Sequence, residues 1–295
     1  MIEGRTAALN SGKLETEIVN SLLQETDEFQ DSRPKFKQRS FKAGGWGVRI
    51  AVTLGLLSLW EIVTSYGHVP SVALPPPEQV AHKFWFILTV GYQGHTLLQH
   101  TFMSLIRIGT GFLSAALLGV LLGVSMSASK ITFHVFDPIV QFLRPIPPLI
   151  YIPLLQVWFG IGELPKDVLI FICAFPYVTI GTIAGARGAK ETMVRMAQCF
   201  GANKIQVYRY VILPSALPEI LTSLRMALGM AWTCLVASEM IAASSGLGWI
   251  AIMAGQQLQT ETIFVSVVCI AILGYAMDLI LRKIEKRLIP WKGKT

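Results

Sequence analysis

The chain has 295 residues, of which 53% are hydrophobic and 15% charged, and its formal net charge is +7. Soluble domains carry roughly 25% charged residues, so this composition predicts one membrane-embedded domain and argues against a soluble enzyme or a nucleic-acid-binding protein. Since a helical span needs roughly 20 apolar residues, the chain has room for about six spans.

Residues 1–45 are polar, and no apolar run precedes Trp46. We therefore expect no signal peptide and interpret 1–45 as a cytoplasmic N-terminal segment. Within it, the apolar residues of 14–23 recur at helical spacing, which predicts a short surface helix followed by a basic stretch. Two interpretations are open: an arm that touches the membrane surface or a cytoplasmic partner, and a poorly ordered tail.

Apolar stretches predict an all-α integral membrane domain over 46–295. The predicted spans are 47–66, 101–126, 133–159, 167–187, 217–243 and 262–288. After the first span, 78–90 is predicted to be an aromatic-rich helix at the outer interface. Inside the third, the run Arg144–Pro148 contains three prolines, which are expected to end or kink the helix.

The distribution of Lys and Arg predicts the orientation of these spans. The segments predicted to be cytoplasmic, which hold six, five and six such residues, are 33–49, 187–210 and 282–295. The predicted outer segments 67–100, 160–166 and 244–260 hold only Lys83 and Lys166. The excess of positive charge on one side places both termini and the loop 188–214 in the cytoplasm.

Cysteine and histidine patterns give no indication of a metal site or an active site. The cysteines, which lack metal-ligand and CxxC spacing, are Cys173, Cys199, Cys234 and Cys269. We expect them to be small apolar packing residues. No histidine lies in an HExxH or carboxylate-rich context, so no metal site and no membrane-enzyme activity are predicted.

Charged residues in or beside the predicted spans admit two interpretations. They are Arg107, Asp137, Arg144, Arg225, Glu239 and Asp278. Each costs at least about 2.5 kcal/mol near the bilayer centre unless it is paired or hydrated. The three arginines could form a path for an anionic cargo. Alternatively, they could form structural ion pairs with acids such as Asp137 or Glu239, or lie at the membrane interface.

The cytoplasmic loop 188–214 predicts a helix, a glycine turn and a second helix that ends at Pro214. Ala197 and Gly201 are small residues one helical turn apart, so a partner protein could approach the backbone closely there. Gly201 also permits the dihedral angles that turn the chain.

This loop resembles the EAA loop of permeases in ATP-binding-cassette (ABC) importers. The matching glycine is Gly201, and Leu213–Pro214 match the end of the motif, whereas Arg195 takes the Glu position and Val211 the Ile position. The resemblance implies a loop that inserts into a groove of the ATPase subunit. The residues assigned to this coupling loop are Arg195, Met196, Ala197, Gly201, Ala202, Leu213 and Pro214.

A second resemblance covers about residues 70–292 and narrows the family. The runs that carry it are Asp137–Pro138, Arg144–Pro148, Pro153–Leu154, Trp158–Gly162, Leu213–Ile220 and Gly246–Gly248. They are similar to the taurine, sulfonate, nitrate and bicarbonate branch of these permeases. Trp158–Gly162 and Arg287–Trp291 look most similar to taurine and alkanesulfonate members, with nitrate, bicarbonate or another small solute as the alternative cargo.

The family resemblance implies a type I permease fold in a bacterial inner membrane, a homodimer of permeases, two cytoplasmic ATPase subunits and an extracytoplasmic binding protein. ATP and Mg²⁺ would bind the partner ATPase, because this chain contains no GxxxxGK[ST] motif and is not expected to be an enzyme. The competing class is an ion-coupled secondary transporter or a channel. That class would be indicated by internal repeats or by a series of acidic residues within the spans, and the sequence shows neither.

Overall fold

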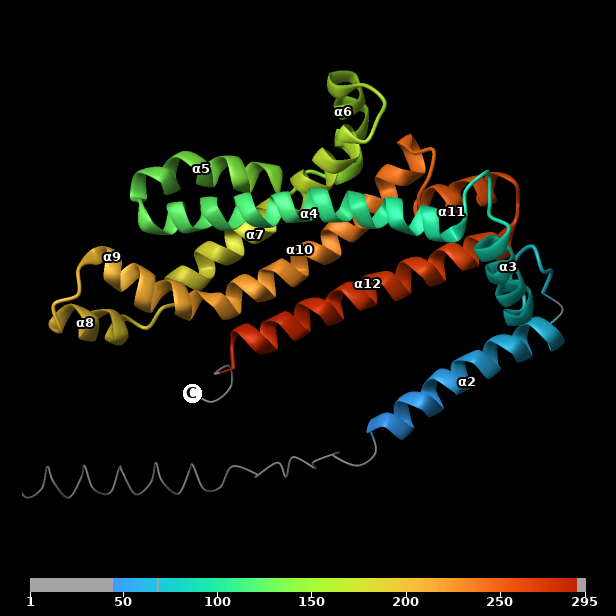
Figure 1. Cartoon of the computed structure of the whole chain (residues 1–295), viewed down its shortest axis with the longest axis horizontal. Coiled ribbons are helices and arrows are strands. Elements are labelled where there is room, and N and C mark those ends of the chain that lie inside the picture. The colour runs from blue at the N-terminus through green and yellow to red at the C-terminus, as the bar shows by residue number, and fades with distance from the viewer. Residues whose placement is uncertain (1–44, 68, 291–295) are drawn as a thin grey trace, which may run out of the picture. The chain divides into compact units, whose positions relative to one another are not determined.

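In the computed structural model, the described residues are 45–67 and 69–290, and they are almost entirely helical (Figure 1). The predicted surface helix at 14–23 lies outside this range. The chain divides after Leu56 into two units, of which the second contains most of the helices. The helices are α2 Gly45–Tyr66, α3 Pro77–Thr89, α4 Leu97–Ala128, α5 Lys130–Leu143, η1 Pro148–Ile150, α6 Tyr151–Phe159, α7 Leu164–Arg187, α8 Glu191–Cys199, α9 Lys204–Val207, η2 Tyr208–Ile212, α10 Leu213–Ala242, α11 Leu247–Gln256 and α12 Thr260–Leu288.

Four of these helical stretches are long and apolar enough to cross a membrane. They are Leu97–Ala128, Leu164–Arg187, Lys204–Met240 and Thr260–Leu288. A fifth crossing is formed if α5 and the η1–α6 segment, which meet at an angle of 88°, count as one broken span. The remaining predicted span, 47–66, falls on α2, whose apolar stretch Ile50–Tyr66 is shorter, and it stays a prediction.

The start of α4 is fixed by its own sequence. The Thr96 hydroxyl accepts from the backbone N–H of Gln99, and the Gln99 side chain accepts from the backbone N–H of Thr96. This reciprocal capping box satisfies two backbone donors that a helix start leaves without partners. The helix therefore begins at Leu97, four residues before the predicted span.

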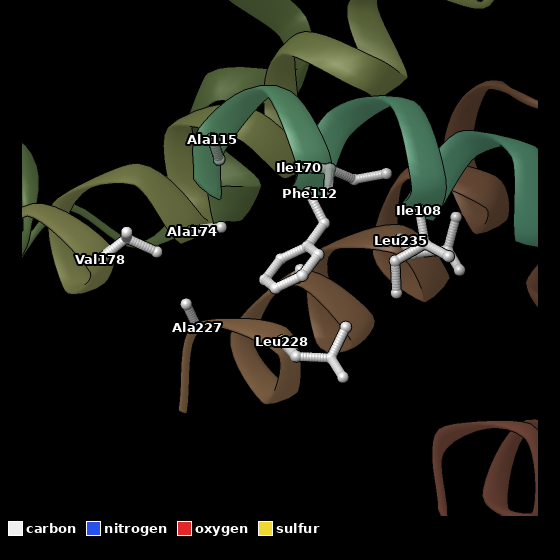
Figure 2. Close-up of a cluster of buried hydrophobic side chains, with 10 residues drawn as sticks. Ile108, Phe112, Ala115, Ile170, Ala174, Val178, Ala227, Leu228 and Leu235 are labelled. Atoms are coloured by element: carbon white, nitrogen blue, oxygen red, sulfur yellow. The ribbon is translucent and has the colours of Figure 1, made fainter. Parts of the chain in front are cut away.

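The core of the bundle is formed where α4, α7 and α10 pack together (Figure 2). Ile108 and Phe112 of α4 face Ile170 of α7 and Leu228 of α10, and all four are buried. Helix α4 approaches α7 closely at three glycines, where an added Cβ would lie 2.6–2.9 Å from side-chain atoms of α7. These residues are Gly111, Gly119 and Gly123, and their role is the close helix packing typical of small residues in membranes.

The prolines of the third predicted span interrupt it as expected. Helix α5 ends at Leu143, and α6 begins at Tyr151 after the short η1 turn. The prediction that a second loop helix ends at Pro214 is wrong. Pro214 lies in the first turn of α10, where a missing N–H is tolerated, and the chain stays helical from Lys204 through the π-turn η2 into α10.

The expectation for the cysteines is also corrected. Cys173 of α7 and Cys234 of α10 form a disulfide with a Cα–Cα distance of 6.8 Å, because the packing of these helices brings together residues 61 positions apart. Cys269 is buried and unpaired, as expected for a small apolar residue, whereas Cys199 is exposed at the end of α8.

Candidate functional site: the α8–α9 loop, the α5–α6 break and three arginines

The loop from α8 to η2 presents apolar side chains to solvent. Met196, Phe200 and Ile205 are 60%, 88% and 78% exposed. Gly201 has a φ of +82°, so the chain reverses there in a conformation that disfavours other L-residues. The side chain of Asn203 then caps α9 by accepting from Gln206 N–H at 2.8 Å. The result is an exposed apolar knob, defined here as residues 191–207.

The sequence interpretation assigned Met196 and Gly201 to this surface but did not single out Phe200 or Ile205. An available signal was the presence of large apolar residues in a loop that is otherwise polar. Arg195, which takes the Glu position of the family motif, forms an exposed ion pair with Glu191 at 2.7 Å on the same helix. Exposed pairs of this kind contribute little to stability. Arg195 is therefore available to a partner protein.

Two links connect the knob to the membrane helices. Helix α9 continues without interruption through η2 into α10, as one stretch from Lys204 to Met240. In addition, the Tyr208 hydroxyl lies 2.6 Å from the Ser127 hydroxyl and donates to the Val124 carbonyl oxygen at 3.0 Å, near the end of α4. The helical stretch that leaves the knob is therefore continuous with α10 and hydrogen-bonded to α4.

The break between α5 and α6 contains a small cavity, and Arg144 lines it. The cavity has a volume of about 30 Å³ and is lined by residues of the break, of α7 and of α10. The Arg144 guanidinium lies 5.8 Å from the centre of the Tyr177 ring. The Tyr151 hydroxyl, which lines the same cavity, is buried and has no hydrogen-bond partner among the described residues. Sequence reasoning identified Arg144 but not Tyr151.

Arg107 is placed very differently, in a buried ion pair. Its side chain is 1% exposed, and Nη1 donates to Glu239 Oε1 at 2.7 Å and to the Ser245 carbonyl oxygen at 2.7 Å. Ser104 donates to the same Glu239 oxygen at 2.7 Å. The other oxygen, Oε2, accepts from the backbone N–H of Gly248 at 2.9 Å, which satisfies a free donor at the start of α11.

Glu163, at the start of α7, extends this network toward solvent. Arg107 Nε donates to Glu163 Oε2 at 2.5 Å, and Lys166 donates to Oε1 at 2.8 Å. The hydrogen bond from Arg107 and the bond from Lys166 outweigh the opposing effect of burial and lower the pKa of Glu163 to about 2. Glu163 therefore remains ionised across the physiological pH range, and the link does not open by titration there.

A histidine completes the network next to these charges. His100 Nδ1 accepts from the backbone N–H of Gly246 at 3.1 Å, which assigns its proton to Nε2, 3.2 Å from the Tyr92 carbonyl oxygen. The ring is fully buried and stacks on Trp249. Together with Arg107 and Glu239, His100 ties the start of α4 to the α10–α11 loop.

The third arginine, Arg225 of α10, also has acidic partners. Its Nη1 donates to Glu285 at 2.9 Å, and Nε lies 3.3 Å from Asp278, both on α12. The structure therefore does not bring the three arginines into one cluster. Arg107 and Arg225 form ion pairs, while Arg144 has no carboxylate within ion-pair distance among the described residues.

The described helices form a bundle, and an exposed knob continues through η2 into its helix α10. Solved structures share the fold: a chain of the inward-facing MetNI methionine ABC transporter has a TM-score of 0.56 at 21% identity, over 65% of this chain and 95% of that chain. This likeness shows that the two chains share a fold.

Residues 115–290 match the binding-protein-dependent transport system inner membrane component family, and the chain belongs to it. The taurine transport permease TauC of Escherichia coli is 40% identical, with 85% of this chain and 94% of that protein covered. The SsuC permease of Bacillus subtilis, named for aliphatic sulfonates, is 33% identical over 87% and 92% of the two chains. The protein is accordingly a multi-pass inner membrane protein, the permease subunit of an ABC importer in the taurine, sulfonate and nitrate branch, and it is not itself catalytic.

Proposed function

We propose that this chain forms the membrane path for a small sulfonate such as taurine. In this proposal two copies of the chain pair with two cytoplasmic ATPase subunits, which bind ATP and Mg²⁺, and receive cargo from an extracytoplasmic binding protein. The 40% identity to TauC over almost its whole length supports the cargo class. Nitrate, bicarbonate or another small solute is the alternative cargo within the same branch.

The observation that carries the anionic cargo is the position of Arg144. This arginine is the one of the three candidates without a carboxylate partner among the described residues, and it lies where a membrane span is broken. Non-helical backbone within a membrane is tolerated where it lines a cavity or is buried in protein. A guanidinium there can offer two parallel N–H donors to a sulfonate, and the unpartnered Tyr151 hydroxyl can offer a third.

The coupling of ATP hydrolysis to transport is assigned to the knob. Its exposed apolar residues Met196, Phe200 and Ile205 would fill a groove of the ATPase, with Arg195 and Ala197 on the same segment. Residues Gly201, Ala202, Leu213 and Pro214 would set the turn and its connection to α10. This role places 188–214 and both termini in the cytoplasm, as the distribution of Lys and Arg predicts.

The test is uptake by the complete importer in proteoliposomes, supplied with ATP inside and taurine-loaded binding protein outside. We expect Arg144→Gln to reduce taurine uptake by at least about tenfold, and Arg144→Lys to recover part of it, because a lysine keeps the charge but not the paired donors. The matched control is Arg187→Gln, since Arg187 also stacks on an aromatic ring, that of Phe133, at 4.2 Å.

Two results would contradict the proposal. Normal taurine uptake by a correctly assembled Arg144→Gln importer would remove Arg144 from the anion path. Transport of nitrate, in preference to taurine, by the wild-type importer with its own binding protein would replace the sulfonate with the alternative cargo.

A further inference from the structure

A second, independent cavity lies between α10 and the end of α12. It measures about 430 Å³ and opens to the surface. Three basic side chains, one acidic side chain and two apolar residues line it: Arg225, Arg282, Lys286, Glu285, Ile289 and Pro290. None of these residues belongs to the knob or to the α5–α6 break.

The positive charge of this cavity is only partly neutralised. Arg225 donates to Glu285, and Arg282 donates from Nε to Asp278 at 2.6 Å. The two terminal nitrogens of Arg282 form no hydrogen bond with the described residues, and Lys286 has no ion-pair partner among them. Arg282 and Lys286 are both exposed, so these donors are available to an anion.

The cavity lies at the depth of a membrane boundary. From Thr262 to Leu281, α12 carries one charged residue, Asp278, over 20 residues. That length corresponds to about 30 Å of helix, the thickness of the hydrocarbon core. The basic run begins directly after it, at Arg282, so the cavity is level with lipid headgroups. Under the orientation of the proposed function, these are headgroups of the cytoplasmic leaflet.

An apolar stripe leads from the cavity along the same face of α12. Val268, Ile272, Tyr275 and Leu279 follow one another at intervals of four, three and four residues, and they are 39%, 60%, 63% and 37% exposed. Arg282 and Lys286 continue this spacing, so the cationic end and the stripe share one helix face. A phospholipid matches this arrangement, with its phosphate in the cavity and its acyl chains on the stripe.

We propose that this site binds an anionic phospholipid by its headgroup phosphate, an inference that rests on the proposed orientation for its assignment to the cytoplasmic leaflet. Basic clusters immediately beside a membrane span attract anionic headgroups. A free anion would use the cationic end and leave the apolar stripe uncovered. If two copies of the chain paired through this face, the same net positive charge would lie on both sides of the contact, and the repulsion would oppose pairing.

The experiment measures lipid retention by the purified full-length chain with native mass spectrometry. Phosphatidylglycerol and phosphatidylcholine with identical acyl chains are compared on the wild type and on Arg282→Gln/Lys286→Gln. The matched control, Lys190→Gln/Lys204→Gln, removes two exposed positive charges from the knob and its flank. We expect the wild type and the control to retain more phosphatidylglycerol than phosphatidylcholine. In the cavity variant, the ratio of retained phosphatidylglycerol to phosphatidylcholine should fall by at least about tenfold.

Each alternative result overturns the inference. An unchanged preference in the cavity variant would show that these side chains do not select the headgroup. Displacement of the lipid by millimolar inorganic phosphate would make the ligand a free anion, and loss of the permease dimer with unchanged lipid retention would assign this face to a second copy. Because lipid retention is measured without transport, a failure of taurine uptake leaves this result intact and identifies a failure of the proposed function alone.

Discussion

Arg107 carries a charge that a bilayer interior penalises strongly, yet it is nearly inaccessible to solvent. Its guanidinium is matched by two carboxylates and a backbone carbonyl, contributed by α7, α10 and the loop before α11. A charge so fully paired has few donors left for a passing anion. Arg107 is therefore better suited to holding these elements together than to guiding cargo.

This assignment makes a prediction for stability. Replacing Arg107 by Met leaves the Glu239 carboxylate, which is 1% exposed, without its counter-charge. We therefore expect the free energy of unfolding to fall by about 3–5 kcal/mol. Thermal unfolding of the purified chain in detergent measures the loss. Combining Arg107→Met with Glu239→Gln should recover much of it, because the neutral amide can keep hydrogen bonds with Ser104 and Gly248.

The control for this prediction is Arg225→Gln. Arg225 forms comparable ion pairs, but its side chain is 30% exposed, so water can compensate for the lost partner and the effect should be smaller. An Arg107→Met chain that unfolds at the wild-type temperature, or a double variant that is no more stable than the single one, would refute the structural role.

The sequence predicted which charged residues need partners, but it predicted only some of the residues that pair with them. Glu239 was considered as an ion-pair partner, whereas Glu163 was not, because 56 residues and a broken span separate it from Arg107. Such pairs depend on how helices pack. The disulfide between Cys173 and Cys234 was missed for the same reason, since local spacing contains no information about a contact between α7 and α10.

The elements themselves were more accessible from sequence. Continuous apolar stretches predicted α4, α7, α10 and α12 within four residues at each end, because length and hydropathy are the main requirements for a span. The interruption at Arg144–Pro148 was predicted from proline chemistry alone. The continuous helix from α9 to α10 was not predicted. A proline interrupts a helix when it lies in the interior but is tolerated in the first turn, and the sequence does not show which of these positions the proline takes.

The orientation of α8 can be tested with the native cysteines. Cys199 is the one exposed free cysteine, since Cys269 is buried and the other two form the disulfide. If the knob faces the cytoplasm, a membrane-impermeant maleimide should label the wild-type chain in inside-out vesicles and not in right-side-out vesicles. Cys199→Ser should abolish the signal.

A positive control for the opposite side comes from α3. Lys83→Cys, introduced into the Cys199→Ser chain, should be labelled in right-side-out vesicles, because α3 is predicted to lie at the outer interface. Labelling of Cys199 from the outside alone would invert the topology, and with it the cytoplasmic assignment of the knob.

For the whole molecule, one continuous helical stretch, from α9 through η2 into α10, leads from the knob to the membrane core. In Figure 1, α8 and α9 lie at one end of the bundle, and α10 runs from them toward α11 at the other end. The Tyr208 contacts join the same end to α4, which packs on α7 through the close glycine contacts. A force on the knob can therefore move α4, α7 and α10 together, as alternating access in the proposed importer requires.

Gly201 is the position at which this transmission can be tested with least effect on the spans. No described atom lies within 4 Å of the site of an added Cβ, so a side chain there meets open space, but its φ of +82° penalises a β-branched residue by about 1–3 kcal/mol. We expect Gly201→Val to insert and assemble but to lose most ATPase stimulation and taurine uptake. Gly201→Asn should retain more of both, since asparagine tolerates a positive φ.

Mixed assemblies extend the test to the proposed homodimer. Importers that contain one wild-type and one Gly201→Val copy can be isolated with two different affinity tags and reconstituted with the ATPase and loaded binding protein. If the two knobs must move together, one defective copy should stall both, and uptake should fall well below the value of about half expected for independent subunits in a symmetric dimer. Full uptake by the Gly201→Val homodimer would show that residues 191–207 do not couple the ATPase to transport. Failure of the two tags to purify together would exclude the homodimer, because a pair of identical subunits must incorporate either copy.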